Sequence, residues 1–315
     1  MIGSDISPAV DHLRAGELVA IPTETVYGLA ANALNDEAVL QIFEAKNRPH
    51  FDPLIVPIGQ RQLPMFEEYI HAEAQTLMDA FWPGPLTVII DKPPFIPDIV
   101  CSGLSTVGLR MPDHPLTQEL LSEIDFPLAA PSANPFTYVS PTTAQHVQDQ
   151  LGDKVSYILD GGPAKVGIES TIVRSDQGGI KVLRLGGLSL DELRKVEPNS
   201  ELEINSNANP KAPGQLDRHY ATQAPLLLVE DVEQAVKESD PATTAVIGMK
   251  LPELKGVNLK LDLSENGDVS EAARNLFAAL RLADSEGIEK IICQKAPETG
   301  LGPAINDRLR RAAFR

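Results

Sequence analysis

Cysteine, long apolar runs and basic residues are all scarce in this 315-residue chain, and each shortage excludes a class of protein. Cys101 and Cys293 lie far apart and belong to no motif, which argues against a disulfide framework and for a reducing compartment. No stretch approaches the roughly 18 apolar residues of a membrane span. The N-terminus has neither the basic start nor the apolar run of a signal peptide. We therefore expect a cytoplasmic protein with no membrane partner.

Several common catalytic and binding motifs are missing as well. The six histidines lack the spacing of metal ligands, and neither cysteine has a basic neighbour that would activate its thiol. The sequence contains no Gly-x-x-x-x-Gly-Lys-Ser/Thr phosphate loop and no Gly-x-Gly-x-x-Gly fingerprint. These residues therefore predict no metal ligand set, no activated nucleophile and no dinucleotide site.

Basic residues are outnumbered, with 27 Lys and Arg against 44 Asp and Glu, a net charge of −17. Residues 1–189 hold 23 acidic and 11 basic side chains, a net charge of −12, and residues 225–315 hold 15 and 12, a net charge of −3. Such a surface repels nucleic-acid phosphates in general. Any binding of nucleic acid is therefore expected to be weak or indirect.

Length and composition predict two domains joined by a linker. A chain of this length is too long for a comfortable single core. Residues 197–224 are rich in Pro, Asn, Ser and Gly and show little periodicity, which is typical of a linker. We expect one domain over residues 1–196 and a smaller one over residues 225–315.

Apolar patterns of strand and helix type alternate in both predicted domains. In the first domain we expect strands at residues 17–21, 54–58, 86–90, 106–109, 155–159, 170–173 and 181–185, and helices at 36–45, 71–81 and 140–151. In the second we expect strands at 226–229, 244–247 and 288–293, and helices at 232–238, 269–285 and 304–313. This alternation predicts an α/β fold, with a parallel sheet in the second domain.

The most informative segment is Ile-Pro-Thr-Glu-Thr-Val-Tyr-Gly-Leu-Ala, residues 21–30. Its proline must end or kink a strand where Thr23, Glu24 and Thr25 supply oxygen atoms. Gly28 then allows a sharp turn or a close approach of the backbone. These features favour a binding site, and the alternative is an ordinary strand-to-helix turn capped by Thr25.

Single cations recur beside small oxygen-bearing residues elsewhere in the chain. Lys46 and Arg48 follow a predicted helix, Arg110 ends a predicted strand, and Arg184 precedes two glycines. Lys46 and Arg48 also fit a plain helix C-terminal turn, and Arg110 a solvated strand end. Isolated cations suit positioning and charge neutralisation, on which nucleotidyl transfer largely depends, more than covalent catalysis.

The motifs that accompany residues 21–30 resemble, in order and spacing, those of the YrdC-like family. They are Lys-Asn-Arg-Pro at 46–49, Pro-Gly-Pro-Leu-Thr at 83–87, Arg-Met-Pro-Asp-His-Pro at 110–115, Pro-Ser-Ala-Asn at 131–134, Ser-Pro-Thr-Thr at 140–143 and Glu-Ser-Thr-Ile at 169–172. Pro-Gly at 213–214, Arg-His-Tyr-Ala at 218–221 and the further domain resemble the two-domain threonylcarbamoyl-AMP synthases. The resemblance implies a YrdC-like twisted mixed sheet with flanking helices, plus a smaller Rossmann-like α/β C-terminal domain.

The resemblance also implies an activity, that of a nucleotidyltransferase. Such an enzyme joins L-threonine, bicarbonate (or CO2) and ATP into threonylcarbamoyl-AMP and releases pyrophosphate, with Mg2+ accompanying the ATP. A separate transferase then uses the product to modify the adenosine beside the anticodon of certain tRNAs. The alternative is a binding module for tRNA or double-stranded RNA with a groove formed by Lys46, Arg48, Lys165 and Arg184. The acidic charge of residues 1–189 weighs against it.

Individual roles follow from the same resemblance. The family's four-residue catalytic signature corresponds to Lys46, Arg48, Ser132 and Asn134. Contacts to L-threonine are implied for Thr25, Arg110, Ala130 and Ser170. Contacts to ATP are implied for Arg48, Asp52, Thr106, Ser132, Ser140, Arg184 and Tyr220. Because Tyr220 belongs to the linker, the linker would act as a lid that excludes water.

Three of these assignments keep an alternative. Ser132 and Asn134 beside prolines also fit a plain turn. Ser140, followed by proline, fits the N-cap of the predicted helix, which can coexist with anion binding. Pro57 stands where the family has a histidine, with His50 as a speculative replacement.

Overall fold

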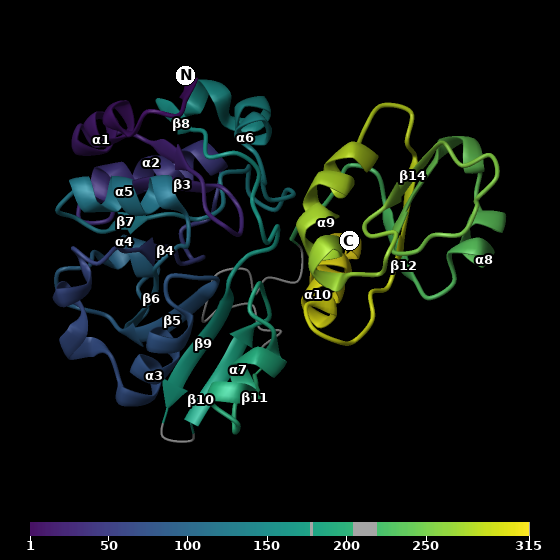
Figure 1. Cartoon of the computed structure of the whole chain (residues 1–315). Helices are drawn as coiled ribbons and strands as arrows, with labels where there is room; N and C mark the ends of the chain where they lie inside the picture. Colours follow the sequence, from purple (N-terminus) through teal and green to yellow (C-terminus); the bar gives the residue numbers. More distant parts are fainter. Residues whose placement is uncertain (177–178, 204–218, 315) are drawn as a thin grey trace.

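The computed structural model describes residues 1–176, 179–203 and 219–314, and Figure 1 shows a larger N-terminal part and a smaller C-terminal part. The strands of the N-terminal part are β1 (Ile2–Gly3), β2 (Val19–Ile21), β3 (Gly28–Asn32), β4 (Ile55–Pro57), β5 (Leu86–Asp91), β6 (Thr106–Arg110), β7 (Leu128–Ala129), β8 (Tyr157–Leu159), β9 (Thr171–Asp176), β10 (Gly179–Arg184) and β11 (Glu201–Leu202). Its helices are α1 (Ile6–Arg14), α2 (Asp36–Lys46), α3 (Ala72–Phe81), α4 (Asp98–Cys101), α5 (Pro115–Glu123), α6 (Ala144–Leu151) and α7 (Leu190–Val196).

The N-terminal part contains two sheets that meet along their edges. One has the strand order β1-β8-β2-β3-β7 and the other β11-β10-β9-β5-β6-β4. Both are mixed, since β2 runs parallel to β8 but antiparallel to β3, and β5 runs parallel to β9 but antiparallel to β6. The N–H of Ala130, just after β7, donates to the carbonyl of Ile55 in β4 at 2.9 Å. The predicted mixed α/β architecture is confirmed, with two sheets in place of one.

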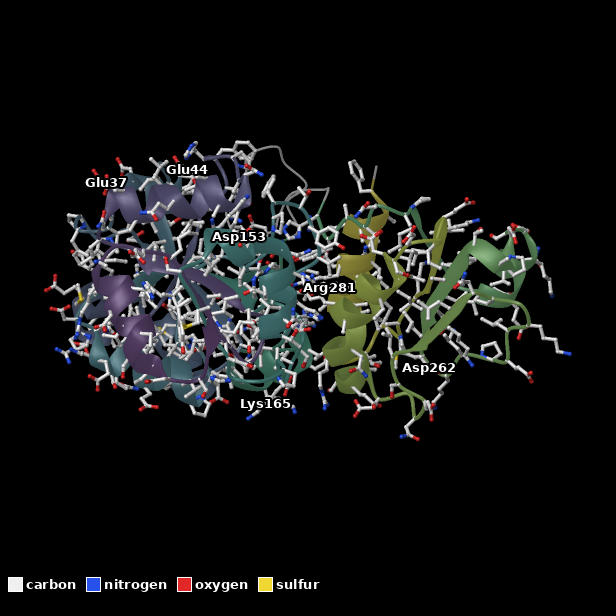
Figure 2. All side chains as sticks on the ribbon, turned by 90° about the horizontal axis from the view of Figure 1, so that it is seen from above. Glu37, Glu44, Asp153, Lys165, Asp262 and Arg281 are labelled. Atoms are coloured by element: carbon white, nitrogen blue, oxygen red, sulfur yellow. The ribbon has the colours of Figure 1, made fainter. Side chains whose placement is uncertain are left out.

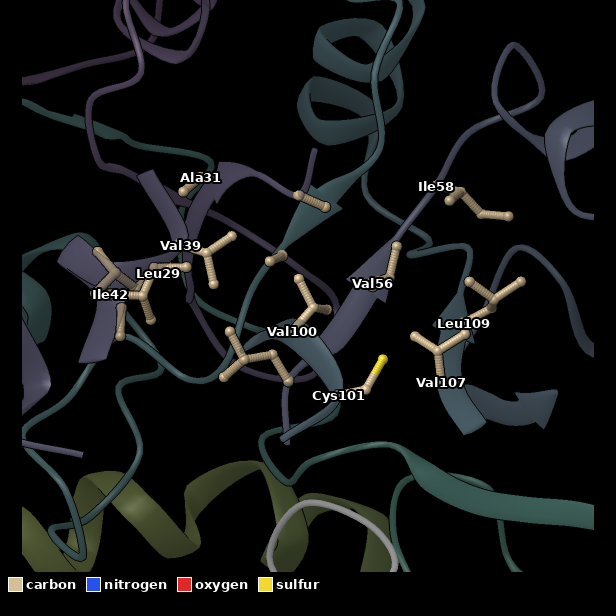
Figure 3. Close-up of a cluster of buried hydrophobic side chains, with 14 of the residues drawn as sticks. Leu29, Ala31, Val39, Ile42, Val56, Ile58, Val100, Cys101, Val107 and Leu109 are labelled. Carbon is tan, nitrogen blue, oxygen red and sulfur yellow. The ribbon is translucent and has the colours of Figure 1, made fainter. Parts of the chain in front are cut away.

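Aliphatic side chains between these sheets and helices α2 and α4 form the main core. Figure 3 shows Leu29 of β3 beside Ile42 of α2, and the sulfur of Cys101 pointing toward Val56 and Val107. All five side chains are at most 3 % exposed, and full burial of each aliphatic one contributes about 1.5–3 kcal/mol. Burial also raises the pKa of the Cys101 thiol to about 12, so the thiol stays protonated at neutral pH.

The C-terminal part is built on a parallel sheet, as the sequence predicts, with four strands where three were expected. Its elements are β12 (Leu226–Val229), α8 (Val232–Lys237), β13 (Thr244–Gly248), β14 (Leu259–Asp262), α9 (Val269–Ala283), β15 (Lys290–Gln294) and α10 (Gly302–Ala313). The strand order is β12-β15-β13-β14, with every neighbouring pair parallel. Helices α9 and α10 lie on the side of this sheet that faces the N-terminal part (Figure 1).

Local capping explains two helix starts, one predicted correctly and one not. Asn35 caps α2 by accepting hydrogen bonds from the N–H groups of Glu37 and Ala38, and the helix begins at residue 36, as the sequence predicts. The prediction that Ser140 caps the helix expected at residues 140–151 is wrong. Helix α6 begins only at Ala144, with Thr143 as its cap.

Part of the predicted linker is described and part is not. Residues 219–224 pack against the C-terminal part, since the N–H groups of Gln223 and Ala224 both donate to the carboxylate of Asp284. Pro213, Gly214 and Arg218 lie outside the described residues. The domain boundaries at residues 196 and 225 stay predictions. None of the helices that the structure describes is long and apolar enough to cross a membrane.

Candidate functional site

A cavity lies where loops of the N-terminal part meet the described end of the linker. Its walls are Ile21, Thr23, Val26, Gly28, Arg48, Ile55, Pro57, Arg110, Pro112, Ala130, Pro131, Ser132, Glu169, Ser170, Arg184, His219 and Tyr220. Seven predicted site residues are among them, namely Arg48, Arg110, Ala130, Ser132, Ser170, Arg184 and Tyr220. Residues separated by most of the chain thus converge on one space.

The threonine that faces the cavity is Thr23, whereas the predicted contact Thr25 is fully buried outside its lining. The two hydroxyl oxygens are 2.8 Å apart, and the Thr23 hydroxyl also donates to the carbonyl of Val26 at 2.6 Å. Gly28 avoids a tight contact here, because an added Cβ would lie 3.3 Å from the Cβ of Ala130. The segment therefore forms a tight turn that packs against residues 130–132.

Lys46 forms hydrogen bonds with the protein backbone in this structure. Its side chain is buried at the end of α2, and its Nζ donates to the backbone carbonyls of Ser132 and Asn134. Burial and the charge of Arg48 lower the pKa of Lys46 well below its ordinary value. The Asn134 amide donates to the carbonyls of Pro135 and Tyr138. Both residues thus hold the loop that carries Ser132 to the cavity, and neither lines it.

Arg48 reaches the cavity from a buried ion pair with Asp52. Its Nη2 lies 2.9 Å from the Asp52 carboxylate, and its guanidinium also donates to the carbonyls of Asp52 and Pro53. Asp52 is 1 % exposed and does not line the cavity. The contact of Asp52 to a nucleotide stays a prediction. In the structure, Asp52 positions Arg48.

Arg110 shares a buried charge cluster with Glu24. The Arg110 Nη2 lies 2.7 Å from Oε1 of Glu24, while Oε2 of Glu24 accepts from the N–H of Asp113 at 3.1 Å. Neither atom of the 2.7 Å contact has a well-directed hydrogen bond among the described residues. The pair is therefore held by charge more than by geometry, which leaves donor capacity for an anion.

Ser170 and Arg184 form the wall at the start of β9 and the end of β10. The guanidinium of Arg184 donates to the Ser170 carbonyl from Nε at 3.1 Å and from Nη2 at 2.9 Å. The hydroxyl of Ser170 lies 2.7 Å from that of Thr87 and 3.1 Å from Nη2 of Arg184. Burial lowers the pKa of Arg184 to about 10, so it stays a cation at neutral pH.

Ser140, Glu169 and Arg308 form a chain of contacts behind this wall. The Ser140 hydroxyl donates to Oε1 of Glu169 at 2.6 Å, and the Nε of Arg308 donates to Oε2 at 3.1 Å. Burial opposes ionisation of Glu169, but the positive charges of Arg308 and Arg184 outweigh it and lower its pKa to about 2. Glu169 lines the cavity and Ser140 does not, so Ser140 binds the carboxylate that faces the cavity.

His219 and Tyr220 close the cavity from the linker side. Both are at most 7 % exposed, and their rings meet edge to face at 4.0 Å. Burial lowers the pKa of His219 to about 3, so the imidazole is neutral at neutral pH. Its buried Nδ1 has no partner among the described residues. The predicted inward position of Tyr220 is therefore seen, together with an imidazole that the predicted set leaves out.

Two further sequence interpretations, those of Thr106 and His50, fit the structure poorly. Thr106 lies at the other end of β6 from Arg110, about 13 Å away at 3.3 Å per residue, and lines a separate small cavity. Pro57 lines the main cavity, but His50 is exposed and packs against Phe43, so it does not replace the family's histidine.

The predicted RNA groove is not a surface feature. Lys46, Arg48 and Arg184 are each at most 7 % exposed, and of the four cations in that groove only Lys165 is exposed. Phosphate backbones need accessible cations, so the structure argues against this alternative.

Comparison with known proteins decides the family. A model of the Sua5, YciO and YrdC proteins, described as telomere recombination, matches residues 11–186, and a model of the threonylcarbamoyl-AMP synthase C-terminal domain matches residues 188–314. The chain is 41 % identical to threonylcarbamoyl-AMP synthase of Pyrococcus abyssi, over 97 % of this chain and 93 % of that protein. This chain belongs to the threonylcarbamoyl-AMP synthase family.

Other members of the threonylcarbamoyl-AMP synthase family agree in length and fold. The Bacillus subtilis protein of that name is 38 % identical over 98 % of this chain and 92 % of its own length. The crystal structure of Pyrococcus abyssi Sua5 complexed with L-threonine matches with a TM-score of 0.90 and 38 % identity, over 98 % of this chain and 94 % of that one. Both parts of the present structure are therefore shared with relatives of known fold.

The described residues of this family member do not offer a metal site of their own. No group of three His, Cys, Asp or Glu side chains that could hold an ion occurs within residues 1–176, 179–203 and 219–314. The two carboxylates beside the cavity, Glu24 and Glu169, are already paired with arginines. They therefore do not fit Mg2+ as free ligands.

Glu169 is expected to stabilise this synthase-family fold down to strongly acidic pH. Its pKa in the folded chain is about 2, below the ordinary value of 4.5. A carboxyl shifted this way contributes stability that is present above pH 4.5 and lost as pH falls through 2. The difference in unfolding free energy between wild type and Glu169→Gln should therefore shrink over this window in urea titrations. A difference that stays constant would contradict the assignment.

Proposed function

We propose that this protein synthesises threonylcarbamoyl-AMP from L-threonine, bicarbonate or CO2, and ATP, with release of pyrophosphate. The observation that carries the proposal is the match to threonylcarbamoyl-AMP synthases over nearly the whole length of both chains. The cavity supports it, because the buried cations Arg48, Arg110 and Arg184 converge there beside hydroxyl groups. An amino acid and a polyphosphate are the kind of anionic ligands that such a set recognises.

L-Threonine would bind at the Arg110 side of the cavity. The guanidinium of Arg110 would hold the substrate carboxylate while Glu24 keeps the guanidinium in place, 2.7 Å away. Ser170 supplies a hydroxyl from the facing wall, and the small side chain of Ala130 leaves room beside it. L-Threonine is the ligand named for the Pyrococcus abyssi crystal structure, and the proposal extends that ligand to this chain.

ATP would bind between Arg48, Ser132 and Arg184, which also line the cavity. The threonine amine adds to CO2 to form a carbamate, and a carbamate oxygen then attacks the α-phosphorus of ATP as the bond to pyrophosphate breaks. The protein contributes fixed positive charge around the phosphates and exclusion of water by His219 and Tyr220. Lys46 and Asn134 act indirectly, by holding the loop of Ser132.

Several accompanying roles remain part of this proposal. Mg2+ is expected to arrive with ATP, held by phosphate oxygens, because the described residues form no site for it. The product would pass to a separate transferase for threonylcarbamoyl-adenosine formation in tRNA. A cytoplasmic location fits these substrates. No stable contact with tRNA is required, in keeping with the net charge of −17.

The function is tested by incubating the purified protein with labelled L-threonine, bicarbonate and ATP. We expect pyrophosphate release only when threonine is present, together with a labelled acyl adenylate. L-Serine in place of threonine serves as the matched control for the side-chain methyl group. Pyrophosphate release that does not depend on threonine, or none at all, would contradict the proposal.

A further inference from the structure

Arg308, in α10 of the C-terminal part, reaches the edge of the cavity from outside its lining. Its side chain is 0 % exposed, yet α10 belongs to the four-stranded-sheet part of the chain. Figure 1 shows α10 on the face of that part that is turned toward the N-terminal part. A fully buried arginine at such a junction needs a physical explanation, because few arginines are fully buried.

Arg308 contacts two residues that line the cavity, Glu169 and Tyr220. Its Nε donates to Oε2 of Glu169 at 3.1 Å, across 139 positions of sequence, and its Nη1 donates to the carbonyl of Leu185. The guanidinium carbon lies 5.7 Å from the ring centroid of Tyr220, over the ring. One side chain from the C-terminal part therefore touches both a carboxylate and an aromatic ring of the cavity wall.

Tyr220 is also held by a second contact from the same part of the chain. Its ring stacks on Phe277 of α9 with centroids 5.2 Å apart. Its backbone lies in the left-handed region, with φ at 61°, a conformation that a tyrosine keeps only where its surroundings fix it. The N–H of Ala221 donates to the carbonyl of Thr137 at 2.8 Å, which joins this segment to the N-terminal part.

A second arginine contact shows that the two parts meet at a defined place. Arg281 of α9, labelled in Figure 2 between the two parts, donates to the carbonyl of Val139 and to the side chain of Gln150. Its guanidinium lies 5.4 Å from the ring centroid of Tyr138. The carbonyl of Val139 immediately precedes Ser140, the other partner of Glu169. Helix α10 thus contacts Glu169 directly, and α9 contacts the backbone beside its partner Ser140.

We propose that Arg308 is a positioning residue through which the C-terminal part sets the geometry of the cavity, by fixing the Glu169 carboxylate and the Tyr220 ring. This inference rests on the proposed function for its consequence in catalysis. The Nη2 atom of Arg308 is buried without a partner among the described residues. Its full hydrogen-bonding capacity is therefore not used to stabilise the fold, which favours a role in arranging the site.

Kinetics of Arg308→Gln provide the first test. Displacing Glu169 and Tyr220 by about 1 Å would lower kcat/KM roughly a hundredfold. Arg308→Lys keeps the charge but loses the planar fork and the flat contact with the ring, so its loss should be smaller. Arg310→Gln, an exposed arginine of the same helix, serves as the matched control and should leave activity unchanged. Equal activity of Arg308→Gln and Arg310→Gln would overturn the proposal.

A double-mutant cycle separates positioning from general damage to the fold. If Arg308 acts through Glu169, Arg308→Gln should lower kcat/KM much less in a Glu169→Gln background than in wild type. The double variant also removes both members of the buried pair, so neither charge is left unpaired and the chain should fold better than Arg308→Gln alone. Strictly multiplicative losses of kcat/KM would show that the two residues act independently and would refute the inference.

A third measurement does not depend on catalysis. In the absence of substrates, hydrogen exchange of the Ala221 amide should be at least tenfold faster in Arg308→Gln than in wild type or Arg310→Gln, because Tyr220 loses its cation. Unchanged exchange overturns the positioning role even if the protein proves to be another kind of enzyme. Faster exchange with no threonine-dependent pyrophosphate release in wild type would keep the positioning role and reject the proposed function.

Discussion

Replacing Arg48 with alanine is expected to abolish pyrophosphate release and to lower the free energy of unfolding by about 3–5 kcal/mol. The loss of activity follows because Arg48 lines the cavity and is one of the cations proposed to face the phosphates of ATP. The loss of stability follows because Asp52, 1 % exposed and 2.9 Å from Arg48, would keep a buried charge without a partner. Urea titrations followed by circular dichroism measure the second effect, and the pyrophosphate assay measures the first.

The two effects can be separated with Arg48→Met combined with Asp52→Asn. This pair removes both charges and keeps most of the side-chain volume, so we expect it to recover part of the stability and none of the activity. An Arg48→Ala protein as stable as wild type would contradict the buried pair. A stable double variant with wild-type turnover would remove Arg48 from the proposed ATP site.

Replacing Arg110 with glutamine is expected to weaken L-threonine binding by about 2–5 kcal/mol, roughly thirtyfold to several thousandfold in Kd. The reason is that the guanidinium is the only cation proposed for the substrate carboxylate, and Glu24 would then face that carboxylate without compensation. Isothermal titration calorimetry with L-threonine gives the Kd directly.

Two variants control this measurement. Glu24→Gln keeps the cation of Arg110 and removes the neighbouring negative charge, so threonine should still bind. Arg61→Gln removes an exposed arginine whose guanidinium donates to the carbonyl of Ser122, and it should leave the Kd unchanged. Wild-type affinity in Arg110→Gln would place the substrate carboxylate elsewhere.

Elements with strong local patterns were predictable from sequence. The strand at residues 226–229 agrees with β12 to the residue, and α2 starts at residue 36, as predicted. Strand β14 was not predicted, because Leu-Lys-Leu-Asp contains no β-branched or aromatic residue. It is defined by its pairing with β13, a long-range contact that a local pattern does not contain.

The composition of the site was more predictable than its geometry. Family motifs indicated Arg48, Arg110 and Ser170 correctly as cavity residues. Spacing could not tell whether Thr23 or Thr25 faces the cavity, because that depends on the hydrogen bonds of one tight turn. A helix-end lysine looks the same in sequence whether it meets phosphate or, as here, two carbonyls.

Contacts between the two parts could not be predicted from sequence patterns. Glu169 stands in a recognised motif, but its partner Arg308 lies in a helix pattern that reads as ordinary amphipathic structure. Only the packing of α10 against the N-terminal part brings them together. His219, beside Tyr220 in the motif at residues 218–221, could have been included on the strength of that neighbour alone.

The contact between Glu169 and Arg308 has a consequence for any exchange of parts between homologues. A chimaera that takes residues 1–186 from one protein and the remainder from another inherits the Glu169 position from one parent and the Arg308 position from the other. If the second parent carries a neutral residue at the Arg308 position, the hybrid buries a carboxylate at the cavity wall without its ion-pair partner. Compatible halves should therefore be recognised by these two positions before overall similarity is considered.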